Sequence, residues 1–229
     1  MPERPYTLLS CSVSLDGYLG DQTPRLALSN DADFDRVDEV RASCDAIMVG
    51  AVTVRTDNPR LLVRSAERRR ERVDSGLASS PRKVTVTAGG ALDPDANFFT
   101  TGDGDKFVYC ASSAATSMRE RLSHLADVVD AGQPVDLRWL GEDLHRRGVR
   151  RLLVEGGGRT LTGFLQADLV DELHLAVAPV FVGESRAHRL VREGLFPWNS
   201  GRRAELAHVQ QIGDVALLTY ALSSRYGKG

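Results

Sequence analysis

One carboxylate and two guanidinium groups follow a short apolar run early in the chain. The run covers residues 46–49 and ends at Gly50, after which come Asp57, Arg60 and Arg64. Guanidinium groups form paired hydrogen bonds with carboxylates and phosphates. The set therefore predicts a site for a polar, anionic substrate. The alternative is an ordinary surface loop that follows a core strand.

The position of this set favours a cofactor nearby. Four apolar residues that end at a glycine are typical of a buried strand in an α/β sheet. Ligands of such sheets bind beyond the carboxyl ends of the strands, where glycine lets a backbone approach a bulky group. Gly50 and Thr53 are thus candidates for cofactor contact. Pro59 predicts an extended path for the polar arm, because the residue before a proline is pushed out of the α region.

A glycine triple forms the second candidate site. Residues 152–154 are predicted to be a core strand, Glu155 stands at its end, and Gly156, Gly157 and Gly158 open a helix. The first N–H groups of a helix lie at the positive end of its dipole, which suits a pyrophosphate. The pattern is neither a Rossmann fingerprint nor a Walker loop, and similar glycine turns join strands to helices without any ligand.

Strands and helices alternate along most of the chain. Strands are expected at residues 6–14, 83–87, 107–110 and 128–129, and helices at 31–42, from 112 or 113 onward, and after a cap at Asp136. This rhythm points to a mainly parallel sheet. Strands at 172–179, 180–183, 205–212 and 215–222 then follow with few helices between them. Gly213-Asp214 predicts a hairpin turn, so the sheet is mixed. With no linker in sight, residues 1–229 are expected to form one domain.

Composition excludes several classes of protein. A formal charge of −2, a pI near 6.2 and a charged fraction of 26% are ordinary for a globular chain and provide no basic field for nucleic acid or anionic membrane. The basic run at 68–70 is interleaved with acids and predicts a solvated helix or loop. Cys11, Cys44 and Cys110 are odd in number and far apart, which favours buried free thiols and a cytoplasmic protein.

Two kinds of chemistry are also disfavoured by the motifs that are missing. The five histidines show no metal-ligand spacing, so no metal site is expected. Neither a G-x-S-x-G elbow nor an S-x-x-K sequence is present, which argues against acyl transfer. A nucleotide-type cofactor beside a polar substrate remains.

Five motifs together resemble a known family. They are S-L-D-G at 14–17, V-G-x-x-T at 49–53, D-N-P-R-L-L-V-R at 57–64, E-G-G-G at 155–158 and L-V-D-E-L at 169–173. In this order and spacing the chain resembles the pyrimidine reductases of riboflavin biosynthesis, of the RibD C-terminal domain type. The resemblance implies a dihydrofolate-reductase-like α/β fold. Such a fold has a mixed, mainly parallel central sheet with helices on both faces and an antiparallel C-terminal hairpin.

The resemblance also implies an activity. A homodimeric, NADPH-dependent reductase of the 5-amino-6-(5-phosphoribosylamino)uracil reductase type would convert the ribosyl side chain of a phosphorylated aminopyrimidine into a ribityl chain. Hydride would pass from the nicotinamide to an opened, imine-like C1′. By the same resemblance, the catalytic residues are Asp57 and Glu155. The substrate-binding residues are Ser29, Arg41, Asp57, Arg60, Leu61, Arg64 and Glu155. The cofactor-binding residues are Asp16, Gly50, Ala51, Thr53, Thr87, Gly156, Gly157 and Gly158.

Tyr18 departs from the pattern of similar reductases, which carry a lysine directly after S-L-D-G. Tyrosine can form hydrogen bonds but supplies no fixed positive charge. The departure leaves two alternatives open: a reductase of a different pterin-like or natural-product imine, or a non-catalytic NADPH-binding module. The sequence also lacks the H-x-E and P-C-x-x-C motifs of the zinc deaminases that some similar reductases carry in front.

Overall fold

The computed structural model describes residues 3–20 and 28–228, and the chain divides into two compact units. Unit 1 comprises the N-terminus up to Pro5 together with Asp38–Leu153, and unit 2 comprises Tyr6–Val37 together with Val154–Gly229. Two elements cross the boundary between the units, helix α1 (Asp31–Ala42) and strand β6 (Arg151–Gly156). That residues 1–229 form a single domain remains a prediction.

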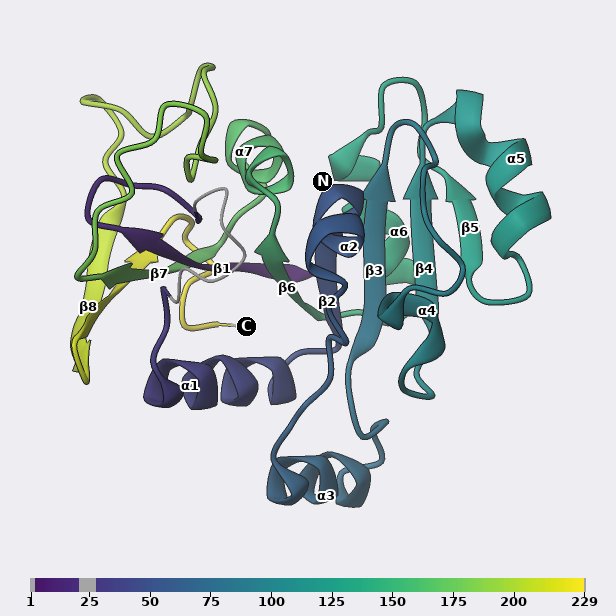
Figure 1. Ribbon diagram of the computed structural model, residues 1–229, viewed down its shortest axis with the longest axis horizontal. Coiled ribbons are helices and arrows are strands. Elements are labelled where there is room, and N and C mark those ends of the chain that lie inside the picture. Colours follow the sequence, from purple (N-terminus) through teal and green to yellow (C-terminus); the bar gives the residue numbers. More distant parts are fainter. Residues whose placement is uncertain (1–2, 21–27, 229) are drawn as a thin grey trace. The chain divides into compact units, whose positions relative to one another are not determined.

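Unit 1 is built on a parallel sheet (Figure 1). Its strands are β2 (Ala46–Gly50), β3 (Arg82–Thr87), β4 (Lys106–Cys110) and β5 (Asp127–Asp130), in the order β5-β4-β3-β2. All of the pairings between neighbours in this order are parallel. Every residue of β2 is buried, as an apolar run in a sheet covered on two faces predicts.

The helices of unit 1 lie on both faces of this sheet and, in one case, beyond the ends of its strands (Figure 1). They are α2 (Ala51–Asp57), α3 (Ala66–Asp74), α4 (Asn97–Thr100), α5 (Ser112–Leu122) and α6 (Leu137–Arg146). In Figure 1, α2 lies in front of the strands, α6 behind them and α3 beyond their ends. The predicted cap of α6 is confirmed, since the Asp136 carboxylate accepts hydrogen bonds from the first backbone N–H groups of the helix. The cap of α5 is Ala111, not one of the two serines expected there.

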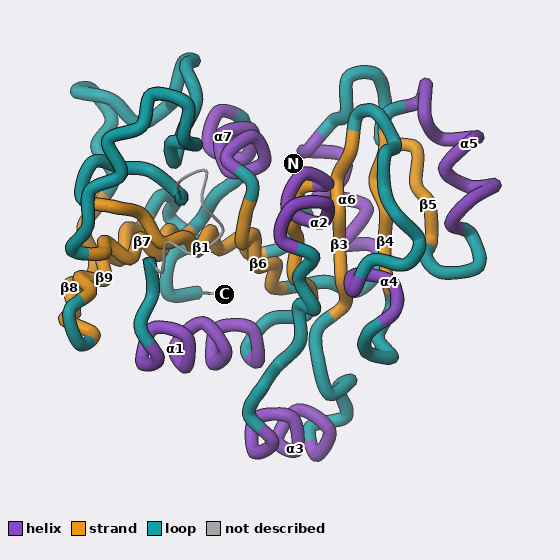
Figure 2. Tube along the Cα trace, in the orientation of Figure 1, coloured by secondary structure: helices purple, strands orange, loops and turns teal. Residues whose placement is uncertain are grey.

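Unit 2 contains the antiparallel strands (Figure 2). Strand β1 (Tyr6–Ser14) pairs in parallel with β7 (Glu172–Ala178), β7 pairs antiparallel with β9 (Val215–Ala221), and β9 pairs antiparallel with β8 (Glu205–Ile212). Helix α7 (Gly158–Gln166) follows β6. The turn between β8 and β9 contains Gly213 at φ 63°, so the predicted hairpin and the mixed character of the sheet are confirmed.

Two sequence-based predictions are wrong. The segment after Thr53 was expected to be extended, but up to Asp57 it belongs to helix α2, because Ala51 and Val54 lie three positions apart and are buried on one face. Residues 58–65 lie outside any helix or strand. Residues 180–183 were expected to be a strand, but they form none. Phe181 is 75% exposed and Gly183 has a φ of 67°, which does not fit a strand.

In α1 and α3, charged side chains are buried where exposed ones were expected, and one large apolar side chain is exposed. Phe34 of α1 is 42% exposed, whereas Asp33 and Asp38 of the same helix are buried. The basic helix α3 was expected to be solvated, yet Arg72 is buried and donates hydrogen bonds to the carbonyls of Ala42 and Cys44 at 2.6 and 2.9 Å. Buried charges of this kind need partners, so these side chains fix neighbouring segments. All three cysteines are buried and free, as predicted.

Candidate functional site

In unit 1, one short helix carries four of the predicted site residues from the carboxyl end of β2. Gly50 is the last residue of that strand and the N-cap of α2, and no side chain caps the helix there. Ala51 is buried, Thr53 is partly exposed, and Asp57 is the exposed last residue of the helix. The carboxyl edge of a parallel sheet is where ligands bind in α/β proteins, so these residues occupy a suitable position.

Asp57 stands at the point where the chain leaves α2. Its carboxylate accepts a hydrogen bond from the hydroxyl of Thr56 at 2.7 Å. Asn58 ends the helix in the left-handed conformation, with φ 43° and ψ 53°, and its side chain accepts a hydrogen bond from the backbone N–H of Asn97 at 2.7 Å. Arg60 is exposed two residues later. The end of α2 is thus tied down while both charged groups face solvent.

Leu61 has an unusual backbone for its type. It lies at φ 52° although its side chain is only 2% exposed, and a left-handed conformation costs a bulky residue energy. The Arg41 guanidinium donates a hydrogen bond to the carbonyl of Leu62 at 3.2 Å. Such strain persists only where the surroundings hold it in place, and it concentrates at binding sites. The geometry therefore supports Arg41 and Leu61 as members of one cluster.

Asp38 fixes the backbone of Arg64. Its two carboxylate oxygens accept hydrogen bonds from the N–H groups of Arg64 at 2.5 Å and Ser65 at 3.0 Å, and Arg68 pairs with it at 3.1 Å. Burial opposes ionisation of Asp38, but these hydrogen bonds and the Arg68 charge outweigh it and lower the pKa of the carboxyl group. This role could not be predicted from local sequence patterns, because the partners of Asp38 lie 26 to 30 positions away.

Thr87 ends β3 with its side chain engaged locally. The residue is buried, and its hydroxyl accepts a hydrogen bond from the N–H of Gly90 at 3.1 Å. That bond closes the turn formed by the glycine pair. Thr87 therefore has a structural task at the place where the resemblance implies contact with the adenosine half of a cofactor.

In unit 2, backbone conformation and packing explain why two residues of the glycine triple are glycines, without any ligand. Gly157 precedes α7 at φ 83°, a conformation that favours glycine. A Cβ atom on Gly158 would lie 3.0 Å from the backbone carbonyl oxygen of Arg189. Glu155 comes just before this turn, within β6 and partly exposed. Because α7 starts with neither a side-chain cap nor an acidic residue in its first turn, its N–H groups can still bind an anion.

Asp16 anchors a neighbouring loop. Its carboxylate accepts hydrogen bonds from the Ser14 hydroxyl at 2.5 Å and from the N–H groups of Val182 and Gly183 at 3.1 and 2.8 Å. The bond from Ser14 is the main cause that lowers the pKa of Asp16 to about 2. With its oxygens occupied in this way, Asp16 fits a turn-holding role more directly than contact with a cofactor.

Tyr18 supports an arginine that the sequence did not single out. The ring of Tyr18 is buried, and the guanidinium carbon of Arg189 lies 4.5 Å from its centroid. Arg189 also donates a hydrogen bond to the phenolic oxygen at 2.9 Å, and the two residues form a β-bridge. A positive charge is therefore held directly over Tyr18. Arg189 was missed because it lies in an irregular segment, 171 positions further along the chain.

Ser29 belongs to a polar cluster in unit 2. Its hydroxyl lies 2.9 Å from that of Ser12 on β1. Ser12 in turn donates to the buried carboxylate of Asp33 at 3.4 Å, and Arg36 donates to the same carboxylate at 2.8 Å. A chain of hydrogen bonds therefore leads from the predicted substrate-binding hydroxyl to a buried ion pair.

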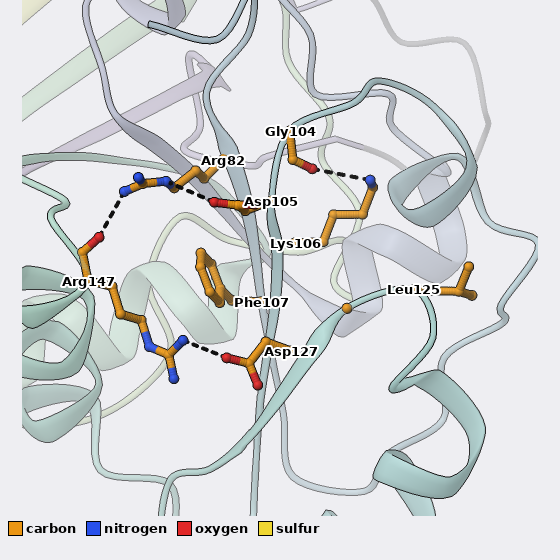
Figure 3. Close-up of a pocket in the computed structure, with 9 residues that line it drawn as sticks. Arg82, Gly104, Asp105, Lys106, Phe107, Leu125, Asp127 and Arg147 are labelled. Carbon is orange, nitrogen blue, oxygen red and sulfur yellow. Dashed lines mark hydrogen bonds and ion pairs between the residues drawn. The ribbon is translucent and has the colours of Figure 1, made fainter.

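A cavity of about 630 Å³ in unit 1 is lined by none of these residues (Figure 3). It opens at the amino ends of β3, β4 and β5, where Arg82, Lys106 and Asp127 line it. Arg82 pairs with Asp105 at 3.4 Å and Arg147 pairs with Asp127 at 2.5 Å. Its charges are therefore largely compensated, and it lies at the edge of the sheet opposite to the one where ligands bind in such folds.

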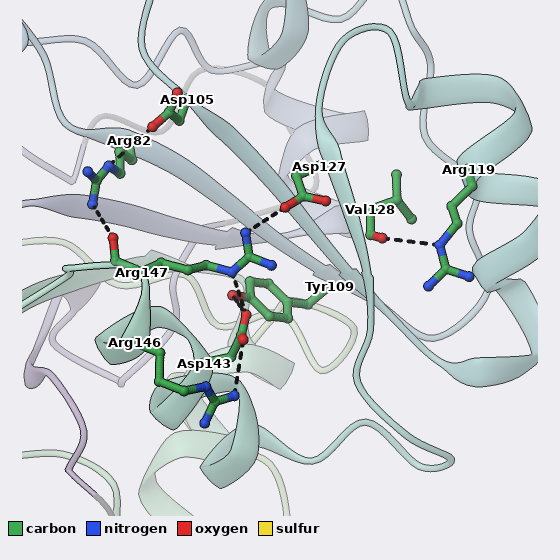
Figure 4. Close-up of polar contacts among 9 residues, drawn as sticks. All are labelled: Arg82, Asp105, Tyr109, Arg119, Asp127, Val128, Asp143, Arg146 and Arg147. Carbon is green, nitrogen blue, oxygen red and sulfur yellow. Dashed lines mark hydrogen bonds and ion pairs between the residues drawn. The ribbon is translucent and has the colours of Figure 1, made fainter.

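The charges beside this cavity form a structural network (Figure 4). Tyr109 donates a hydrogen bond to Asp143 at 2.7 Å, and Arg146 and Arg147 donate to the same carboxylate at 3.0 and 2.7 Å. Burial opposes the charge on Asp143, but these donors prevail and lower its pKa, while burial raises the pKa of Tyr109. The network joins α6 to the sheet and occupies both carboxylate oxygens of Asp143 as acceptors.

The fold and these clusters define an α/β protein of the dihydrofolate-reductase-like class. The chain belongs to the RibD C-terminal domain family, whose model matches residues 5–218. It is 36% identical over 222 residues to the 2,5-diamino-6-ribosylamino-4(3H)-pyrimidinone 5′-phosphate reductase of Methanothermobacter thermautotrophicus, covering 96% of this chain and 99% of that one. It is 38% identical over 183 residues to the Archaeoglobus fulgidus reductase of the same name, covering 79% and 83%.

Solved structures support the same fold. Acinetobacter baumannii RibD superposes with a TM-score of 0.78 at 24% identity, over 95% of this chain and 58% of that one. A pyrimidine reductase-like protein from Corynebacterium diphtheriae gives a TM-score of 0.79 at 19% identity, over 95% and 91%. The predicted family and fold class are thereby confirmed. Within the part of the chain that the structure describes, no helix is long and apolar enough to cross a membrane.

Proposed function

We propose that this protein is an NADPH-dependent reductase of a phosphorylated ribosylaminopyrimidine, the 2,5-diamino-4(3H)-pyrimidinone form. The relatives from M. thermautotrophicus and A. fulgidus carry the name of that activity. The structural observation that carries the proposal is the hold of Asp38 on the backbone of Arg64. This contact fixes a guanidinium-bearing segment next to the end of α2, as recognition of a phosphorylated substrate requires.

The residues present fit a nicotinamide dinucleotide. Gly50 is the N-cap of helix α2 and Gly157 that of α7, and neither helix has a side-chain cap or an acidic residue in its first turn. Anions bind well at such helix starts. When bound, the cofactor supplies the hydride. Gly50, Ala51 and Thr53 are the cofactor-binding residues that we propose in unit 1, and the three residues of the glycine triple are those that we propose in unit 2.

Binding and orienting the substrate is the task of the charged groups. Arg41 and Arg64 would bind phosphate or ribose oxygens, with Arg60 and the strained Leu61 beside them. The carboxylate of Glu155 would bind the pyrimidine edge. In the diamino form this edge offers two adjacent N–H donors, the 2-amino group and N3–H, whereas the uracil form replaces the 2-amino group by a carbonyl oxygen, which repels a carboxylate. Asp57 would hold the substrate near the reacting carbon and assist the transfer of a proton.

Tyr18 does not weaken the assignment. The positive charge that a lysine would bring to this position is held there by Arg189, which stacks on the Tyr18 ring. A guanidinium held in this way keeps further N–H donors for a phosphate oxygen.

The test is to follow NADPH oxidation by its absorbance with the two purified pyrimidine phosphates. We expect turnover with both and a higher kcat/KM for the diamino form. NADPH should also raise the melting temperature more than NADH at equal concentration, because tighter binding to the native state stabilises it more. Tight NADPH binding without oxidation of either substrate would contradict the reductase. Equal stabilisation by the two cofactors would contradict the preference for NADPH.

We also propose a homodimer that covers the outer face of the C-terminal hairpin. Leu206 and Val209 of β8 are 51% and 57% exposed, and they lie opposite Tyr220 and Leu218 of β9. Strand β8 is an edge strand, exposed at every residue except Ile212. Long exposed apolar edges lead to aggregation unless a partner covers them, and a second copy presents the same surface.

The dimer is tested by replacing Val209 with glutamate. Light scattering should give the mass of a dimer for the wild type and of a monomer for the Val209→Glu variant, because a charge buried at the centre of an interface is costly. Gln210→Glu introduces a charge at the neighbouring position on the other face and should leave the dimer intact. A monomeric wild type at working concentration would overturn this proposal.

The buried free thiols lead us to place the protein in the reducing cytoplasm.

A further inference from the structure

The polar cluster that contains Ser29 has a fixed hydrogen-bond direction. Arg36 and Asp33 set it, since a guanidinium only donates and an ionised carboxylate only accepts. The Asp33 side chain is fully buried, and the Arg36 side chain is 12% exposed. Arg36 Nε and Nη2 both lie 2.8 Å from Oδ1 of Asp33. Both oxygens of the Asp33 carboxylate accept hydrogen bonds, Oδ1 from Arg36 and Oδ2 from Ser12.

The Nη1 group of Arg36 also fixes the direction of a hydrogen bond. Its Nη1 lies 3.3 Å from Nδ1 of His174. Arginine cannot accept, so Nδ1 carries the lone pair and the proton of His174 is on Nε2, which lies 2.7 Å from the Glu172 carboxylate. Tyr6 donates to the second oxygen of Glu172 at 2.7 Å. His174 and Glu172 therefore hold the Arg36 guanidinium in place, and the ion pair between Arg36 and Asp33 is kept.

The hydrogen bonds between Asp33, Ser12 and Ser29 also have a fixed direction of donation. Oδ2 of Asp33 faces the hydroxyl of Ser12 at 3.4 Å, and this hydroxyl must donate because the carboxylate cannot. A hydroxyl has one proton, so Ser12 cannot also donate to Ser29 across their contact of 2.9 Å. Ser29 must therefore donate to Ser12. The proton of Ser29 then points inward, and the lone pairs of its oxygen point away from the cluster.

We propose that Asp33 and Ser12 orient Ser29 so that its hydroxyl accepts a hydrogen bond from a sugar hydroxyl of the substrate. The inference rests on the proposed function, which places a ribosyl chain at Ser29, and it adds the polarity of that contact. Ser12 and Asp33 are positioning residues that act through Ser29. A substrate group that can only accept, such as an ether or carbonyl oxygen, would be rejected at this position, because the serine has no proton left to offer it.

The experiment uses analogues of the pyrimidine phosphate in which one ribosyl hydroxyl at a time is replaced by fluorine. Fluorine accepts weakly and cannot donate. With the wild type, one analogue should show a KM raised by about tenfold, the size expected for one lost hydrogen bond. The same analogue and the parent substrate should have KM values within about twofold in Ser29→Ala. If every fluorine is tolerated, or if the penalty persists unchanged in Ser29→Ala, the assigned polarity is wrong.

Substitutions on β1 test the role of Ser12. Ser12→Ala should raise KM for the parent substrate by about five- to tenfold, while kcat and the affinity for NADPH stay within about twofold of the wild type. Ser12→Thr keeps the hydroxyl and should have the KM of the wild type. Ser10→Ala is the matched control, two residues away on the same face of β1, and should change nothing. Ser12→Ala combined with Ser29→Ala should raise KM no more than Ser29→Ala alone. Additive effects would show that Ser12 does not act through Ser29.

The outcomes separate this inference from the proposed function. Turnover of the parent substrate by the wild type tests the function alone. The dependence of the fluorine penalty on Ser29 and Ser12 tests the polarity alone. A measured melting temperature of each variant shows whether a raised KM comes with a general loss of structure, and Ser12→Thr remains informative if Ser12→Ala is poorly folded.

Discussion

Replacing Asp57 with asparagine should lower kcat by about 100-fold or more, while the affinity for NADPH changes by less than about threefold. The reduction consumes a hydride and a proton, and general acid catalysis by a positioned carboxyl group contributes about 10²- to 10⁴-fold. Asparagine has nearly the same shape but cannot exchange a proton at neutral pH. Steady-state rates of NADPH oxidation and cofactor binding by fluorescence titration measure the two quantities separately.

The chain offers a matched control in Asp74→Asn. Asp57 is the last residue of α2 and Asp74 is the last residue of α3, and both are exposed. An acid at the negative end of a helix is electrostatically unfavourable, so neither substitution should lower the melting temperature. Asp74→Asn should keep full activity. Loss of activity in both variants, or activity within tenfold of the wild type in Asp57→Asn, would contradict a role for Asp57 in catalysis.

Elements defined by local patterns could be predicted from the sequence. The bounds expected for β1, α1 and β8 coincide with those observed. An apolar strand, an Asx cap and a Gly-Asp turn each depend on a few neighbouring residues, so a short window contains the information. The same holds for α7, which the glycine triple was expected to open and which begins at Gly158.

The error at α2 shows how a correct local rule was applied too widely. Pro59 restricts the residue before it, and Asn58 indeed leaves the right-handed helical region. The restriction reaches no further, so residues 51–57 were free to form a helix, with Ala51 and Val54 buried against the sheet. Proline therefore indicated the end of a helix, whereas it was interpreted as evidence for an extended arm.

The supporting residues of the candidate site could not be predicted because their partners are distant in sequence. No local pattern distinguishes Asp33 and Asp38 from the other acids of α1, yet both are buried by contacts with residues outside the helix. Gly158 was interpreted through a possible ligand, whereas the carbonyl of Arg189 supplies a reason within the chain. Which polar groups are buried is decided by tertiary contacts, and one sequence does not reveal them.

Asp38 offers the second large effect. Replacing it with alanine should lower the free energy of unfolding by about 3–5 kcal/mol, since the change leaves Arg68 without its buried partner and deprives two backbone N–H groups of their acceptor. Glu39→Ala, at the next and exposed position of the same helix, should cost less than about 0.5 kcal/mol. Urea denaturation measures both values.

Hydrogen exchange and pH dependence distinguish a local role of Asp38 from general destabilisation. The amides of Arg64 and Ser65 should lose their protection in Asp38→Ala and keep it in Glu39→Ala, and KM for the substrate should rise with the loss of order at Arg64. The pKa of Asp38 is lower in the folded protein than its ordinary value of 3.8, so its contribution to stability is present above that value and is lost as the pH falls below it. The difference in stability between wild type and Asp38→Ala should therefore be largest at neutral pH and shrink below about pH 4. A difference that stays constant down to pH 2 would mean that the carboxylate charge is not what holds this segment.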